Sequence, residues 1–216
     1  MPAGLEERDA SSGLGLRMSN LTVQITELNT PLDASKMLKV RNAPRYAGEP
    51  PLEWLKTRYR GNKPEGGLWT STYTKDEPYL SDWQYGRLNN IAIQLAYPPE
   101  KQENLRPYLV YPKKNARVLV IDSFQTAVEF TSEFHMASSP ELARKTTLLA
   151  TAEITDWSSA FRKFDAIHLT AEAADEIAFH ALEARFDSAF HTWNCEATLW
   201  GRWMFDRVED LVVESV

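Results

Sequence analysis

The sequence predicts a single α+β domain in which mostly antiparallel strands are surrounded by helices. Strand-like segments come first, helical segments occupy the middle, and strand-like segments return late, which differs from strict βαβ alternation. A length of 216 residues and a hydrophobic fraction of 43% are typical of one large globular domain. We assign residues 1–18, rich in Gly, Ser and charges, to a flexible tail and residues 19–216 to the domain.

Alternation of apolar and polar residues predicts the first strand, because polar residues separate Leu21, Val23 and Ile25. A second short strand is expected at 37–41, where Asn42 and Pro44 follow and end it. The next expected elements are a short helix at 52–55, a strand at 67–73, and a helix that begins at Ser81 and carries Trp83, Tyr85 and Leu88.

The later half alternates between strands and helices. Ser123 and Asp156 are expected to cap helices, and the longest helix is expected at 172–190. We expect that helix to bury Ile177, Phe179, Leu182 and Phe186 on one face. The remaining expected elements are strands at 108–111, 116–121, 165–170, 194–200 and 211–213 and a helical run at 140–149.

Composition excludes some function classes. A net charge of -6 argues against non-specific nucleic-acid binding, which relies on clustered Lys and Arg. The single cysteine, Cys195, cannot form an intrachain disulfide, so a reducing cytosol is expected. No apolar stretch approaches the roughly 20 residues that a membrane-spanning helix needs. We therefore expect a cytoplasmic protein.

The segment from Lys63 to Ser71 carries the clearest functional signal. Gly66 and Gly67 permit a tight turn or a close approach of the backbone to a ligand. The strand after them offers Trp69 beside two hydroxyls, which favours a pocket for a flat, polar small molecule. Thr70 and Ser71 point to opposite faces of an alternating strand, so only one of them can line that pocket.

Three segments together resemble the ADP-ribosyltransferase fold. Residues 39–42 resemble its first strand, which carries an Arg or His that anchors the dinucleotide, and residues 66–72 resemble its hydroxyl-rich strand. Residues 193–200 resemble the late strand that bears the catalytic glutamate. The chain is similar in particular to small phage and bacterial mono-ADP-ribosyltransferase-like proteins with a Lys-Pro-x-Gly-Leu-Trp-x-Ser segment followed by a Trp-rich helix, where Ser81, Trp83 and Tyr85 stand here.

This resemblance implies two packed sheets with NAD as co-substrate in the cleft between them. Glu196 is the implied catalytic carboxylate, because the oxocarbenium-like state formed on NAD cleavage needs a negative charge near the ribose. Arg41 is the implied anchor of a phosphate or ribose through its planar fork of donors, with Arg58 and Arg60 as alternatives. Nicotinamide or adenine would stack on Trp69 and Trp83, while Thr70 and Ser71 would bond the ribose or carboxamide and hold Glu196 in place.

The same resemblance implies transfer of ADP-ribose to a macromolecule, with inversion at the anomeric carbon. A protein acceptor in a host cell is favoured, as for a phage or bacterial cytotoxic effector acting in the host cytosol. Position 194 is Asn, where related toxins carry a Gln or Glu that helps to choose the acceptor, so other acceptors or NAD hydrolysis alone stay open.

Other hypotheses stay open beside this one. A non-enzymatic interaction protein could keep the fold without the pocket, and a glycoside-type hydrolase would need a pair of acidic residues. A zinc site at His180, His191 and Cys195 matches no close-paired ligand pattern. A Cys195 nucleophile with His168 or His180 as its base is a further alternative.

Overall fold

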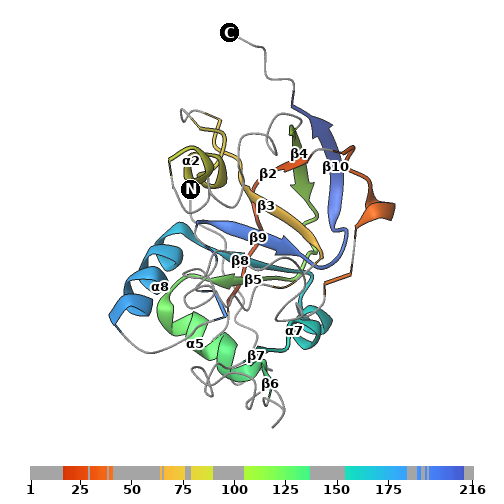
Figure 1. Ribbon diagram of the computed structural model, residues 1–216. Coiled ribbons are helices and arrows are strands. Elements are labelled where there is room, and N and C mark those ends of the chain that lie inside the picture. Colours follow the sequence, from red (N-terminus) through yellow and green to blue (C-terminus); the bar gives the residue numbers. More distant parts are fainter. Residues whose placement is uncertain are drawn as a thin grey trace, which may run out of the picture.

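The computed structural model shows a curled β-sheet with helices packed around it (Figure 1). The described residues are 17–28, 30–37, 39–40, 64, 66–75, 79–89, 105–136, 154–183, 189–190, 193 and 195–211.

Eight strands form the main sheet in the order β1-β5-β8-β9-β3-β2-β4-β10. All neighbouring strands in it are antiparallel except the parallel pair β5 and β8, which confirms the predicted α+β class. The strands are β1 (Arg17–Met18), β2 (Gln24–Leu28), β3 (Leu68–Thr72), β4 (Arg106–Pro112), β5 (Val118–Ile121), β8 (Ala166–Leu169), β9 (Ala197–Trp200) and β10 (Phe205–Asp210), and a separate two-stranded sheet joins β6 (His135–Met136) to β7 (Ile154–Thr155).

Strand β3 links the two halves of the main sheet. Its first residues pair with β9, where Thr70 lies opposite Thr198, and its last residues pair with β2, where Thr72 lies opposite Gln24. The described strands therefore form one continuous sheet that changes partners at β3, in place of the two packed sheets that the resemblance implies.

Helices begin where the sequence places their caps. They are α2 (Asp82–Asn89), α5 (Phe124–Glu133), α7 (Trp157–Lys163), α8 (Ala171–Glu183) and a short 3-10 helix, η1 (Ala34–Lys36). Ser123 caps α5 in a reciprocal capping box with Thr126. The Asp156 carboxylate accepts from the Ser159 amide at 3.0 Å in α7, and the Ser81 hydroxyl accepts from the Gln84 amide at 3.1 Å at the start of α2.

Alternation along the strands places a hydrophobic cluster on each face of the sheet. One cluster packs under α5, α7 and α8 and is largely aromatic, with Phe130, Trp157, Phe190 and Trp193 in mutual ring contact. The opposite cluster contains Leu68, Val110, Val118, Ala166, Trp200 and Phe205.

Several predicted elements differ from the structure. The strand expected at 37–41 is absent at its described residues 37, 39 and 40, which follow the short helix η1. The last described strand is Phe205–Asp210, Leu211 lies outside it, and residues 212 and 213 of the strand expected at 211–213 lie outside the described residues. Strand β1 uses two residues assigned to the tail. The elements expected at 52–55 and 140–149 lie outside the described residues.

The longest helix also differs from its prediction. Helix α8 ends at Glu183, and Ala189 and Phe190 lie in a turn. Ile177 is buried as expected, whereas Phe179 is 57% exposed, because two residues further along a helix turn the side chain away from the core. Within the described part of the chain, no helix combines the length and the apolar character needed to cross a membrane.

Candidate functional site

The candidate site forms where β9 begins beside the end of β3. Thr70 lies opposite Thr198 in the antiparallel pair of β3 and β9. Position 72, two residues after Thr70, therefore lies opposite position 196, two residues before Thr198. Glu196 thus comes to lie against the two hydroxyl-bearing residues that end β3, Ser71 and Thr72.

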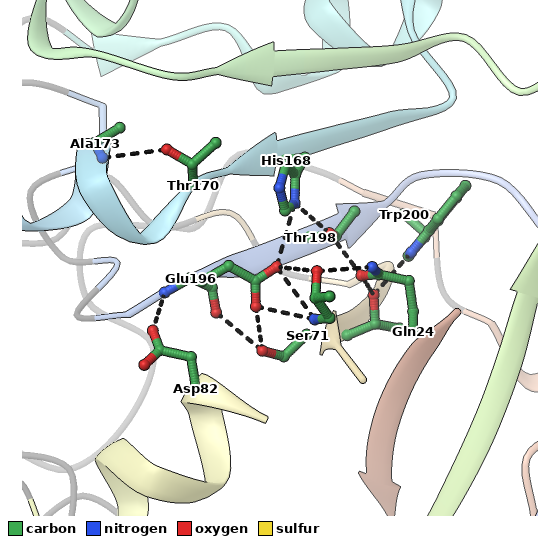
Figure 2. A network of polar contacts seen from close by, with 11 residues as sticks. Gln24, Ser71, Asp82, His168, Thr170, Ala173, Glu196, Thr198 and Trp200 are labelled. Atoms are coloured by element: carbon green, nitrogen blue, oxygen red, sulfur yellow. Dashed lines mark hydrogen bonds and ion pairs between the residues drawn. The ribbon is translucent and has the colours of Figure 1, made fainter. Parts of the chain in front are cut away.

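The Glu196 carboxylate is held by a set of donors from this strand (Figure 2). The Ser71 hydroxyl donates to Oε2. The Thr72 amide donates to Oε2 at 3.0 Å and to Oε1 at 3.2 Å, and the Thr72 hydroxyl donates to Oε1 at 3.0 Å. Hydrogen bonds to an ionised acceptor are about twice as strong as neutral ones, so this arrangement fixes the orientation of the carboxylate.

Helix α2 fixes the backbone of the same residue. The Glu196 amide donates to Oδ2 of Asp82, in the first turn of α2, at 2.7 Å. Glu196 is only 6% exposed, and this burial raises the pKa of its carboxyl group above the ordinary value. The donors on Ser71 and Thr72 oppose the rise, whereas the nearby Asp82 charge adds to it.

A buried polar network lies beside the carboxylate. The Gln24 carbonyl oxygen accepts from the Thr70 hydroxyl at 3.0 Å and from the Thr198 hydroxyl at 2.9 Å. The Gln24 amide group donates to the Thr72 hydroxyl at 3.1 Å, and the Trp200 indole donates to the Thr70 hydroxyl at 3.0 Å. This network of three strands, β2, β3 and β9, therefore connects the core of the sheet to Thr72, which binds Glu196.

His168 completes this network from β8. Its Nδ1 lies 2.8 Å from the Thr198 hydroxyl and 3.3 Å from Glu196 Oε1. Burial lowers the pKa of His168 from 6.5 to about 4, and the charge of Glu172 on α8 opposes this shift. His168 is therefore neutral at pH 7.

The segment that leads into Glu196 is anchored by aromatic packing. The Trp193 ring lies 4.6 Å from that of Trp69, edge to face, and stacks on Trp157 at 5.9 Å. Trp69 thus contributes to the core beneath the site. Trp83 lies on α2 and is half-buried.

Helix α2, which carries Asp82, also borders a cavity of about 470 Å³ at the ends of β2, β4 and β10. Ser71 pairs with Ile25 across β2 and β3, and Glu27 lies two residues further along β2, so the three side chains share one face of the sheet. The cavity is lined by Glu27, Leu80, Gln84, Leu105, Arg106, Pro107, Asp210 and Leu211.

The structure brings some of the predicted site residues together and separates others. Ser71 and Glu196 are in direct contact, as the resemblance implies, while Thr70 points to the opposite face, as the alternation predicts. The predicted anchor Arg41 and its alternatives Arg58 and Arg60 lie outside the described residues, so the role of each stays a prediction.

The described residues include some of the side chains named in the competing metal and thiol hypotheses. No group of three His, Cys, Asp or Glu side chains there could hold a metal ion, and His191 is not among them. His180 stacks on Phe124 at 4.3 Å, and His168 Nδ1 contacts Thr198 and Glu196. Cys195 is buried.

Sequence reasoning missed several residues of the site. Gln24 lies in a segment interpreted only as an alternating strand, and Asp82 follows a residue interpreted only as a cap. His168 was considered only as a base for Cys195. Each belongs to an ordinary polar or charged type without a local motif, so no signal in the sequence indicated that it faces Glu196.

Comparisons of the chain with protein-family models, with curated proteins and with solved structures found no match.

Proposed function

We propose that this protein cleaves NAD at the bond between nicotinamide and ribose and transfers ADP-ribose to a protein acceptor. The observation that carries the proposal is the contact between Ser71, Thr72 and the Glu196 carboxylate. Donors that hold an anion in one orientation inside a protected site are what electrostatic stabilisation of a developing cation requires.

The chemistry follows from the charge that develops in NAD. As the C1′–N bond breaks, its electron pair goes to nicotinamide, and positive charge spreads over C1′ and the ring oxygen of the ribose. The Glu196 carboxylate, beside the ribose 2′-hydroxyl, would stabilise this charge. A nucleophile then attacks C1′ from the opposite face and loses its proton, which gives inversion.

The surroundings of Glu196 also determine the pH range in which the proposed reaction would proceed. The carboxylate must be ionised, whereas burial and the Asp82 charge favour the protonated form. The donors on Ser71 and Thr72 favour the ionised form and so limit the rise in its pKa. Activity should increase on going from acid to neutral pH, and its acid limb should lie above the ordinary pKa of a glutamate.

The nearby cavity is the place where we expect the acceptor to bind. Its lining contains the carboxylates of Glu27 and Asp210 and one guanidinium, that of Arg106. This balance favours a neutral or cationic group over the dianionic diphosphate of NAD. The volume of about 470 Å³ is within the usual range for small-molecule sites.

The decisive test is nicotinamide release from NAD by the purified protein, with and without host lysate. Glu196→Gln should reduce release by about 10²- to 10³-fold, the usual cost of removing one preorganised electrostatic partner. Glu209→Gln, which changes an exposed glutamate on β10, is the matched control and should keep full activity.

The other hypotheses correspond to distinct outcomes. Equal release without lysate would indicate an NAD glycohydrolase. A folded protein that releases no nicotinamide and gains no thermal stability from NAD would contradict the proposal and favour an interaction protein. Among the described residues, the large hydrophobic side chains exposed for such contacts are Tyr85 (51%) and Phe179 (57%).

A further inference from the structure

His168 stands out among the buried titratable groups, because the chemistry proposed above does not use it. It projects from the middle of β8, between β5 and β9. Its side chain is 10% exposed and that of Glu196 is 8% exposed, and its Nδ1 lies 3.3 Å from Glu196 Oε1. Figure 2 shows the ring placed between Glu196 and Thr198.

The direction of the hydrogen bonds in the network can be worked out from its ends. An indole nitrogen only donates, so Trp200 supplies the proton of its bond to the Thr70 hydroxyl. Thr70 therefore donates its own proton to the Gln24 carbonyl oxygen. That oxygen only accepts, so Thr198 also donates its single hydroxyl proton to it.

This order determines which nitrogen of His168 carries the proton. The Thr198 hydroxyl has already donated its proton to Gln24 and can only accept from the ring at 2.8 Å. Nδ1 must therefore be protonated in the neutral ring. The same N–H faces Glu196 Oε1, whereas the opposite tautomer would place a lone pair against the carboxylate.

We infer that His168 is a positioning residue, held as its Nδ1–H tautomer by Gln24 and Thr198, which orients the Glu196 carboxylate for reaction. The inference rests on the proposed function. The Nδ1 of His168 lies 3.3 Å from Glu196 Oε1 on one side, and the Thr72 hydroxyl donates to Oε1 at 3.0 Å on the other. Rotation of the carboxylate away from the ribose would break both contacts.

Two acidic side chains act on the pair from neighbouring helices. Glu172 on α8 acts on the His168 ring, and Asp82 on α2 acts on Glu196. Both would favour an imidazolium or a protonated carboxyl, whereas burial disfavours the imidazolium. At a pH where Glu196 is ionised, His168 is therefore expected to be neutral and to act as a hydrogen-bond donor.

The tautomer can be tested without any assay of activity. In protein labelled with ¹⁵N-histidine, the signals of His168 among the four histidines are those missing from His168→Asn. At pH 7 we expect a protonated Nδ1 and an unprotonated Nε2. A matched variant, Thr198→Val, keeps the shape of the acceptor side chain but removes its oxygen and should lower the population of the Nδ1–H tautomer. A protonated Nε2 or an imidazolium in the wild-type protein would overturn the inference.

The positioning role is tested by the kinetics of nicotinamide release. His168→Leu removes the ring from beside Glu196 Oε1 and should lower kcat about 10- to 100-fold with little change in KM, because a misplaced catalytic group reacts more slowly. His168→Asn places an amide donor near the position of Nδ1 and should restore most of kcat. A folded His168→Leu with wild-type kcat would contradict the role.

The two proposals fail in different ways. If the wild-type protein releases no nicotinamide, the proposed function fails together with the positioning role of His168. The ¹⁵N-histidine spectrum still shows whether His168 is the Nδ1–H tautomer. If the wild-type protein is active and Asn rescues no better than Leu, the positioning role fails and the proposed function stands.

Discussion

Acidification should destabilise this protein through His168. In the folded protein its pKa is lowered from 6.5 to about 4. Between these two values the unfolded chain binds a proton that the folded protein does not, so the free energy of unfolding decreases as the pH falls. The loss begins near the unfolded pKa and is complete near the folded pKa.

The magnitude follows from the shift. A difference of roughly 2.5 pKa units, at about 1.4 kcal/mol for each unit, gives a loss of about 3 kcal/mol between pH 7 and pH 4. Glu196 acts in the opposite direction, because its raised pKa makes the folded state bind a proton more tightly and lowers stability as the pH rises above 4.5. That contribution is shared by variants that keep Glu196.

The measurement is urea unfolding of the wild-type protein and of His168→Asn at several pH values from 7 to 4. The wild-type protein should lose about 3 kcal/mol more than the variant over this range. Ile167→Val, next to His168 on β8, is the control. It should lower the free energy of unfolding by about 0.5–1.5 kcal/mol, by the same amount at every pH. Parallel pH curves for the wild-type protein and His168→Asn would refute the reasoning.

Three further predictions concern the site and the turn before it. Ser71→Ala removes a donor from Glu196 and should lower kcat for nicotinamide release roughly tenfold with KM nearly unchanged; an unaltered kcat would argue against the orienting role. Gly67→Ala should lower the free energy of unfolding by roughly 1–3 kcal/mol in a urea titration, since φ is +71° and a new Cβ would lie 2.6 Å from the Trp200 carbonyl oxygen. Asp210→Asn should reduce ADP-ribose transfer to protein in lysate while leaving hydrolysis of NAD by water unchanged, and equal loss of both would remove the acceptor assignment.

Local signals in the sequence predicted much of the fold. Ser123 and Asp156 cap helices because their side chains accept from amides only three residues away, a relation that the sequence displays directly. Strand β3 and its alternation were likewise readable, and they predicted that Thr70 and Ser71 face opposite sides. The prediction for Phe179 was wrong because that residue lies on the outer face of its helix, and the structure offers no local cause for the missing strand at 37–41.

The site could be predicted only in part, because its contacts join distant parts of the chain. Ser71 and Glu196 are separated by 125 positions, and Gln24 and Thr198 by 174. The resemblance supplied the first pair. Nothing in the sequence predicted the contact between Gln24 and Thr198, since a glutamine in an alternating strand forms no pattern that indicates its partner. His168 was missed for the same reason.

The order of the strands has a consequence for how the protein folds. Strand β9 lies between β8 and β3 and joins the β1-β5-β8 group of strands to the β3-β2-β4-β10 group. Each group contains strand pairs that do not involve β9, such as β5 with β8 and β2 with β3, but the two groups can associate correctly only when β9 enters between them. Such long-range pairing slows folding. Because Glu196 directly precedes β9, an intermediate that lacks this strand would contain most of the secondary structure and no assembled site, so recovery of activity should follow the slowest refolding phase.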